Sequence, residues 1–348
     1  MALYDAVADH PLRIDEVGLT RRERDTSSGF TRVTTEITLR GDGETGRGED
    51  VTYDAAPHDA LVDRQPFDLA GEYTVAAFSE ALDDVELFPD VDPEQAAARN
   101  YRRWGFESAA LDLALRQAGE SLASALGRTY DPVNFVVSTR LGDPPTVDRI
   151  ETLLDADPDL AFKLDPTSDW DADLVADLAS RATVRIVDLK GQYEGTDVDQ
   201  SADLDLYRLV ADAFPKAVIE DPALTAETDA FVDEVADRVS WDHPITGVDS
   251  VESLPFEPRW LNVKPSRFGS VESLLDTIEF ARKRDIRLYG GGQFELGVGR
   301  QHLHAFASLF YPESPNDVAP GGYNDPEPPD GLPSSPLSPP DDPRGLEW

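Results

Sequence analysis

The chain has 348 residues and a formal net charge of −38 at pH 7, yet 40% of its residues are hydrophobic. That apolar content predicts a folded protein with a strongly acidic surface, so nucleic acid and anionic membranes are expected to be poor partners. Cysteine is absent, which excludes disulfides and cysteine metal sites. The sequence has neither a basic-then-apolar leader nor a window approaching the roughly 20 apolar residues of a membrane span, so a soluble, cytoplasmic protein is expected.

Lysine is scarce, with five lysines against 26 arginines. This scarcity, together with acidic residues spread through helical segments, indicates a halophilic protein, because salt screens the repulsion between its charges. Three lysines nevertheless lie in apolar, strand-like stretches: Lys163, Lys190 and Lys264. Arginine stays charged at biological pH, whereas a partly buried lysine can exchange its proton, so these three are candidate acid/base groups. The alternative for each is a structural cation beside a carboxylate.

The first 130 residues predict an α+β domain. Three short strands are expected, at residues 12–20, 31–41 and 46–54. Alternation of polar and apolar residues in the second strand indicates a sheet with one solvated face. A helical pattern over residues 93–127, interrupted at Gly119, predicts a helix pair.

After Pro132, apolar strands alternate with acidic helices. Strands are expected at residues 133–139, 160–165, 184–190, 217–221, 245–249, 260–264 and 286–291. Such a chain of β/α units implies a parallel sheet, and seven or eight units suggest a closed barrel. An open doubly wound sheet is the alternative, without a GxGxxG motif after its first strand to support it. The final 23 residues, from Pro326, hold eight prolines and predict an extended or disordered tail.

Acidic residues end four of the expected strands: Asp165, Asp188, Glu220 and Asp249. In parallel β/α barrels the C-terminal ends of the strands converge on one mouth, where active sites lie. Converging carboxylates repel one another unless a cation is present, and hard oxygen ligands favour Mg²⁺ over zinc. For any single acid, a helix N-cap or a surface position is the alternative.

The two-residue repeat of a strand relates these acids to the lysines. Residues i and i+2 point to the same side of a strand. Lys163 and Asp165 are therefore expected to face the same interior, as are Asp188 and Lys190.

The order Lys163, Asp188, Glu220, Asp249 and Lys264, with an IEDP turn and a later GGGQFELGVG segment, resembles the enolase superfamily. The nearest branch is that of muconate lactonizing enzyme, which includes o-succinylbenzoate synthases and dipeptide epimerases. The resemblance covers about residues 11–325. It implies an α/β fold, a modified TIM barrel or (β/α)7β barrel over residues 131–325, preceded by an α+β capping domain over 1–130. The proline-rich tail, 326–348, is left outside it.

The resemblance also implies a chemistry. One Mg²⁺ ion would be bound by Asp188, Glu220 and Asp249 and would hold the carboxylate of a small-molecule substrate. A lysine would remove the neighbouring proton, giving an enediolate that the cation stabilises. The protein would then be a lyase or isomerase, since cycloisomerisation, racemisation or epimerisation, and syn-dehydration share this first step. The family also makes a homo-oligomer the expectation.

The sequence departs from the family at two positions. The family usually has Lys-x-Lys at the second barrel strand, whereas this chain has Lys163-Leu164-Asp165. It commonly has Asp-x-Asn at the third, where this chain has Lys190. We hypothesise that Lys190 replaces the missing lysine. Lys264 matches better, but it follows Asp249 too closely for a full β/α unit, so Asp242 and Glu252 are alternatives to Asp249.

Further residues are expected to contact substrate. Gln293 and Glu295 fit the end of the seventh strand, and Asp165 the end of the second. Loops of the N-terminal domain, at residues 26–30 and 53–57 and including Tyr53, are expected to set specificity. His302 and His304 are expected to pack in a helix.

Two other functional classes stay open at this point. One is a catalytically silent barrel that binds a small carboxylate or is structural, as Asp165 suggests. The other is a metal-dependent hydrolase or aldolase.

Overall fold

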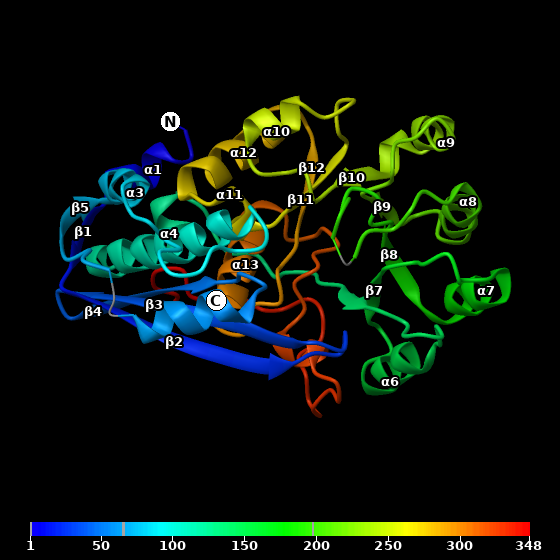
Figure 1. Ribbon diagram of the computed structural model, residues 1–348, viewed down its shortest axis with the longest axis horizontal. Helices are drawn as coiled ribbons and strands as arrows, with labels where there is room; N and C mark the ends of the chain where they lie inside the picture. Colours follow the sequence, from blue (N-terminus) through cyan, green and yellow to red (C-terminus); the bar gives the residue numbers. More distant parts are fainter. Residues whose placement is uncertain (1, 65–66, 197) are drawn as a thin grey trace.

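The computed structural model describes residues 2–64, 67–196 and 198–348. Figure 1 shows an N-terminal domain, blue to cyan, beside a larger parallel sheet whose strands run from green to orange. The structure is thus a mixed α/β fold with an antiparallel N-terminal domain and a curled parallel sheet.

The N-terminal domain holds a two-stranded and a three-stranded antiparallel sheet. Its strands are β1 (Pro11–Ile14), β2 (Glu16–Asp25), β3 (Thr31–Gly41), β4 (Glu44–Asp50) and β5 (Gly71–Thr74). Its helices are α1 (Asp5–Ala8), α2 (Ala55–Asp63), α3 (Val75–Asp83), α4 (Ala98–Ala118) and α5 (Leu122–Ala125). The first expected strand is therefore two strands, since β1 pairs with β5 and β2 pairs with β3.

The expected solvated face of β3 is absent, because residues 32–39 of this strand are all buried. β3 is the central strand between β2 and β4, and both α4 and α2 contact it. The two faces of β3 differ in polarity and not in exposure, since one is mainly apolar and the other carries buried polar residues such as Thr34 and Thr38.

Seven parallel strands follow in the order β12-β11-β10-β9-β8-β7-β6. They are β6 (Val137–Thr139), β7 (Ala161–Leu164), β8 (Thr183–Asp188), β9 (Val218–Glu220), β10 (Val239–Trp241), β11 (Trp260–Val263) and β12 (Arg287–Gly290). The helical segments are α6 (Asp148–Ala156), α7 (Ala172–Arg181), α8 (Leu204–Ala213), α9 (Asp229–Glu234), η1 (Ala236–Arg238), α10 (Val248–Glu252), α11 (Pro265–Phe268), α12 (Val271–Lys283), α13 (Val298–Phe310) and η2 (Gly321–Asn324). In Figure 1, α6 to α9 lie along the outer side of the sheet, away from the N-terminal domain.

One expected strand is wrong. Residues 245–249 form the connection into α10, and the strand at this place in the sheet is β10. Val239 lies four residues after Val235 and so continues the helical spacing of Phe231, Val232 and Val235. The first residue of the three-residue strand β10 therefore looks like part of the preceding helix in the sequence.

The segment Asn316–Asp317 makes hydrogen bonds with both ends of the parallel sheet. The N–H of Val136, beside β6, donates to Asn316 O at 2.8 Å, and the N–H of Asp317 donates to Gly290 O of β12 at 2.7 Å. The two edge strands therefore share one backbone partner.

Glu49 of β4 joins the N-terminal domain to the start of α13. Its buried carboxylate accepts the N–H groups of Leu296 at 2.7 Å, Gly297 at 3.0 Å and Gly299 at 2.9 Å. The first N–H groups of a helix have no partner within the helix and carry partial positive charge, so a carboxylate stabilises this end. The contact fixes the N-terminal domain against the chain that follows β12.

The proline-rich tail packs on the rest of the chain. Leu337 pairs with Val133 beside β6, and the N–H of Leu346 donates to Asp112 of α4 at 2.8 Å. Trp348 packs edge-on against Tyr130, with ring centroids 5.7 Å apart. Among the described residues, no helix combines the length and the apolarity that a membrane span needs.

Gly48 offers a test of the packing of α4 on the three-stranded sheet. A Cβ at Gly48 would lie 1.9 Å from the carbonyl oxygen of Gly105 in α4, so G48A should destabilise the protein by about 1–3 kcal/mol. Urea unfolding measures this. G18A is the matched control, since its Cβ would meet its nearest neighbour at 3.4 Å; equal stabilities of G48A and G18A would contradict the close approach.

His302 in α13 should make stability depend on pH. Burial, with a smaller effect of Arg116, lowers its pKa from 6.5 to about 3. Below pH 6.5 the unfolded chain therefore binds a proton on this histidine that the folded chain does not bind. As a consequence, the free energy of unfolding falls as the pH drops from about 6.5 towards 3, by up to about 1.4 kcal/mol per pH unit. H302Q should reduce this slope in urea unfolding between pH 6.5 and 4.5 by up to about 1.4 kcal/mol per pH unit, while His304 and His243, whose pKa values burial also lowers, keep their share. H10Q, at a less buried histidine, should retain it; an unchanged slope in H302Q would argue against a neutral, buried imidazole.

Candidate metal centre and active site

Three carboxylates meet at the C-terminal edge of the parallel sheet. Asp188 ends β8, Glu220 ends β9, and Asp242 follows β10. The register places Asp188 beside Glu220 and Glu220 beside Ser240, so Asp242 lies two residues further along on the same face. Trp241 between them belongs to the hydrophobic core.

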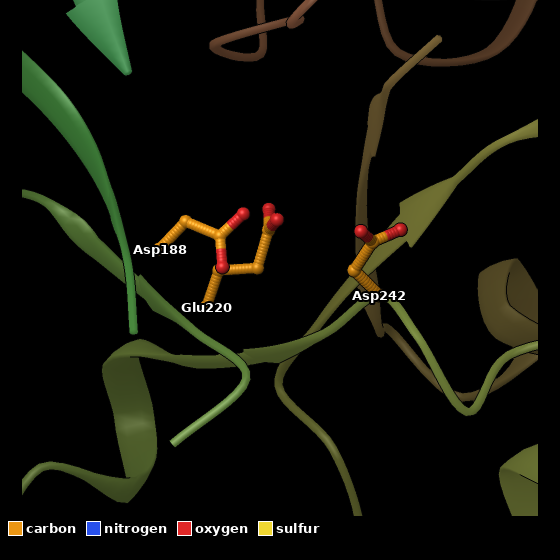
Figure 2. A group of neighbouring side chains, drawn as sticks. All are labelled: Asp188, Glu220 and Asp242. Atoms are coloured by element: carbon orange, nitrogen blue, oxygen red, sulfur yellow. The ribbon is translucent and has the colours of Figure 1, made fainter. Parts of the chain in front are cut away.

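The three side chains are close enough to share an ion. One oxygen of each lies within 4.8 Å of the others, and all three residues are fully buried. Figure 2 shows Asp188 and Glu220 side by side, with Asp242 facing them. Across residues 2–64, 67–196 and 198–348, this is the one group of its kind among histidine and acidic residues.

Asp249, one of the three expected metal ligands, is not part of this group. It lies in the first turn of α10 at an exposed position, because residues 245–249 form no strand. Asp242, named above as a substitute, occupies the third position.

Lys163 of β7 lies between two of these carboxylates. Its Nζ contacts Glu220 closely, Asp188 Oδ2 at 2.9 Å and Asp317 Oδ2 at 3.5 Å. Burial disfavours its charge, but the surrounding carboxylates outweigh burial and raise the pKa of Lys163 well above its usual value. Lys163 is therefore a buried group whose charged form this arrangement favours.

Lys190 lies beside the same carboxylates but reaches further outward. It contacts Asp188 closely and lies 3.8 Å from Asp165 Oδ2. Asp165 is expected to face the same interior as Lys163. In the structure Asp165 pairs with Arg140, whose Nε is 3.3 Å away. Burial opposes the charge on Lys190, yet the nearby carboxylates raise its pKa.

Lys264 lies on the opposite side, at Asp242. Its Nζ donates to Asp242 Oδ2 at 2.8 Å. The same oxygen accepts the Tyr193 hydroxyl at 2.7 Å and lies 3.4 Å from Arg267 Nη2. Despite burial, these cations lower the pKa of Asp242 far below its usual range.

Glu220 has two neutral partners that sequence reasoning missed. Tyr289 of β12 donates a short hydrogen bond to its carboxylate, and the Asn262 side chain of β11 donates at 3.1 Å. Burial and the neighbouring Asp188 raise the pKa of Glu220 well above its usual value. The i, i+2 spacing of Asn262 and Lys264 was the available signal, since it places both on the face that carries the site.

Gln293, Glu295 and Tyr53 form a second cluster. The Tyr53 hydroxyl donates to Gln293 Oε1 at 2.8 Å, and the Gln293 N–H donates to Glu295 Oε1 at 2.7 Å. Glu295 lies 3.2 Å from Arg300, and among the described residues none of its ion pairs involves a lysine. The structure thus joins the N-terminal domain to the chain after β12 through Tyr53.

A cavity of about 920 Å³ reaches the site at Lys190, whereas Asp188, Glu220 and Asp242 are not among its lining residues. Its wall includes the N-terminal loop at residues 25–31, the chain after β6 and β7, and both Lys190 and Asp165. Trp170 and Phe30 supply apolar surface there. The expected specificity loop at residues 26–30 therefore lines this cavity.

Solved structures of the enolase superfamily share this fold. A dipeptide epimerase from Methylococcus capsulatus, solved with a Mg ion, aligns with a TM-score of 0.70 at 20% identity, covering 97% of this chain and 99% of that one. A muconate cycloisomerase from Pseudomonas fluorescens aligns with a TM-score of 0.64 at 22% identity, covering 89% and 88%. The resemblance to the enolase superfamily, muconate lactonizing enzyme branch, is confirmed. The chain belongs to the family described as domain of unknown function DUF8230, whose N-terminal domain matches residues 5–125 and C-terminal domain residues 129–325.

Curated relatives by sequence are enzymes. An o-succinylbenzoate synthase from Bacillus subtilis is 28% identical over 229 residues, which cover 62% of this chain and 58% of that enzyme's length. An N-succinylamino acid racemase from Thermus thermophilus is 28% identical over 330 residues, covering 88% and 84%. These relatives support an enzyme whose reaction they leave unspecified.

The site residues suit a divalent cation of the Mg²⁺ kind. Their donors are carboxylate oxygens, and Asp242 Oδ1 is buried without a hydrogen-bond partner among the described residues. A buried acceptor without a partner is costly, and a cation would satisfy it. Asp188, Glu220 and Asp242 would hold such an ion.

Magnesium should raise the melting temperature of the protein, because an ion that binds only the folded state adds about 2.7 kcal/mol at one hundred times its Kd. D242N should abolish the rise in a thermal shift assay with and without EDTA. D249N is the matched control and should behave as the parent does. If D249N lost the rise and D242N kept it, the assignment of the third carboxylate would be reversed.

Proposed function

We propose that the protein is a Mg²⁺-dependent lyase or isomerase that removes a proton beside the carboxylate of a small-molecule substrate. The observation that carries the proposal is the group of buried carboxylates Asp188, Glu220 and Asp242, with lysines on two sides of it. A single Mg²⁺ would supply Lewis-acid stabilisation of the negative charge that proton removal creates. Cycloisomerisation, epimerisation or racemisation, and syn-dehydration all agree with this step.

In this proposal a different lysine lies on each side of the carboxylate group. Lys264 approaches from the Asp242 side and Lys190 from the Asp188 side. Lys190 lines the cavity, whereas Lys163 does not and is enclosed by carboxylates. We assign proton transfer to Lys190, which lines the cavity, and to Lys264, which matches the family's lysine position better than the other two, and give Lys163 the task of holding Asp188 and Glu220 together. Lys190 would thus replace the lysine that the family has where this chain has Asp165.

Asp165 and the N-terminal loop fit a substrate site at the cavity. Asp165 is on its wall, and the loop at residues 25–31 closes one side. Gln293, Glu295 and Tyr53 form the connected cluster on the N-terminal domain's side, which would contact the distal part of a substrate.

We also propose that Asn316–Asp317 acts as an eighth strand and closes the barrel, which its hydrogen bonds to both edges support. A net charge of −38 with five lysines supports function at high salt. A homo-oligomer is proposed from the family resemblance alone.

The second candidate is a silent barrel that binds a carboxylate without turning it over. Asp165 in the family's lysine position, and the pairing of Lys163, Lys190 and Lys264 with carboxylates, favour it. Solvent exchange separates the two candidates.

The test is Mg²⁺-dependent exchange of solvent deuterium into a panel of dipeptides, hydroxy acids and aryl succinates, followed by NMR. We expect exchange that EDTA abolishes and that K190A and K264A each reduce by about 10²–10⁴-fold, the usual loss for a general acid/base group. K283A, at an exposed lysine of α12, should exchange like the parent. Full activity in K190A would refute its assignment, and absence of Mg²⁺-dependent exchange across the panel would favour the silent barrel.

A further inference from the structure

Asp242 is anchored through only one of its carboxylate oxygens. Oδ2 accepts the Tyr193 hydroxyl at 2.7 Å and Lys264 Nζ at 2.8 Å, and Arg267 Nη2 is 3.4 Å away. Oδ1 is buried and has no hydrogen-bond partner among the described residues. This one-sided anchoring leaves an oxygen for a shared cation.

Tyr193 reaches Asp242 from the loop after β8, although β9 lies between β8 and β10. Neighbouring strands are about 4.8 Å apart, so the loop and the side chain together have to cross roughly two such spacings. The loop is laid directly over the chain after β9: the N–H of Gly191 donates to Asp221 O at 2.9 Å. A Cβ at Gly191 would lie 2.2 Å from Ala223 N, so glycine allows this approach.

The ring of Tyr193 contacts the other side of the site. Lys190 Nζ lies 5.0 Å from the ring centroid, within the range of a cation–π contact. His243, which follows Asp242, packs on the same ring with centroids 4.3 Å apart. Lys190 adopts a left-handed φ of 54°, which is uncommon for a residue with a side chain, so its placement depends on its surroundings.

We propose that Tyr193 is a positioning residue for both sides of the site. Its hydroxyl turns Asp242 towards the cation, and its ring supports the ammonium group of Lys190 at the cavity. This inference rests on the proposed function, because it presupposes a bound cation and a working Lys190. A tyrosine that only fills space would tolerate the loss of its hydroxyl.

The first experiment measures Mn²⁺ affinity by EPR in the full-length chain, because the metal alone is the probe and no substrate is needed. Y193F keeps the ring and removes the hydroxyl, and it should weaken Mn²⁺ binding by about 10-fold or more, the usual loss for a group that orients a metal ligand. Y207F is the matched control: Tyr207 is also buried, and among the described residues its hydroxyl makes one hydrogen bond, accepting the N–H of Ala223 at 3.2 Å, and none to the carboxylate group. Y207F should bind Mn²⁺ as the parent does.

The second experiment observes Lys190 directly. Because the chain has only five lysines, ¹³C labelling of lysine gives few signals, and K190R assigns the one from Lys190. The aromatic ring shifts this signal in the parent and in Y193F, whereas in Y193L it should move to the position of a lysine without a ring neighbour. Melting temperatures without metal show whether each variant is folded.

The outcomes separate this inference from the proposed function. Parental Mn²⁺ affinity in Y193F, or an unmoved Lys190 signal in Y193L, would overturn the corresponding half of the inference while the function stands. A parent protein that binds no Mn²⁺ would overturn the proposed function, and this inference with it.

Discussion

The balance of buried charge at the C-terminal edge of the parallel sheet is the constraint on which the rest of the site depends. Three buried carboxylates lie together, and removing such groups from water costs several kcal/mol each unless opposite charges and hydrogen bonds compensate. Lys163 and Lys190 compensate on one side, and Lys264 with Arg267 on the other. These cations come from strands of the sheet or from the segments that follow them, Arg267 from α11, so the site exists only when the strands are in register.

The N-terminal domain is tied to this edge through polar groups. Glu49 stabilises the start of α13, and Tyr53 holds Gln293 on the chain after β12. Arg32 adds a third link, since its Nε donates to Gln293 O at 3.1 Å while its other nitrogens bond to the backbone at Val51 and Thr52. These contacts hold the N-terminal domain against the chain after β12, and the loop of that domain at residues 25–31 lines the cavity. The same chain thus builds the carboxylate group on rigid strands and the cavity wall on a separately anchored loop.

Most of the parallel strands can be predicted from the sequence, because each is a short apolar run between acidic helices. Sequence reasoning found Asp188 and Glu220, since both end such runs. It failed at β10, where a strand of three residues continues the spacing of the helix before it, and the third carboxylate was therefore placed at Asp249 instead of Asp242. It also missed Tyr193 and Tyr289, whose hydroxyls reach across the sheet to carboxylates on other strands. No local pattern marks such a residue, because its partner is set by strand order.

The sequence by itself determined the acidic surface, the β/α rhythm and the lysines worth attention, because composition and periodicity are local properties. The family resemblance also followed from the order of a few residues along the chain. Only the tertiary structure decided which acid completes the carboxylate group and that Lys163 is enclosed by carboxylates while Lys190 reaches the cavity. The physical reason is that the packing of strands far apart in sequence determines which groups surround a charge. A lysine at one strand end can therefore be a buried counter-ion, while a lysine at the next strand end lines a cavity.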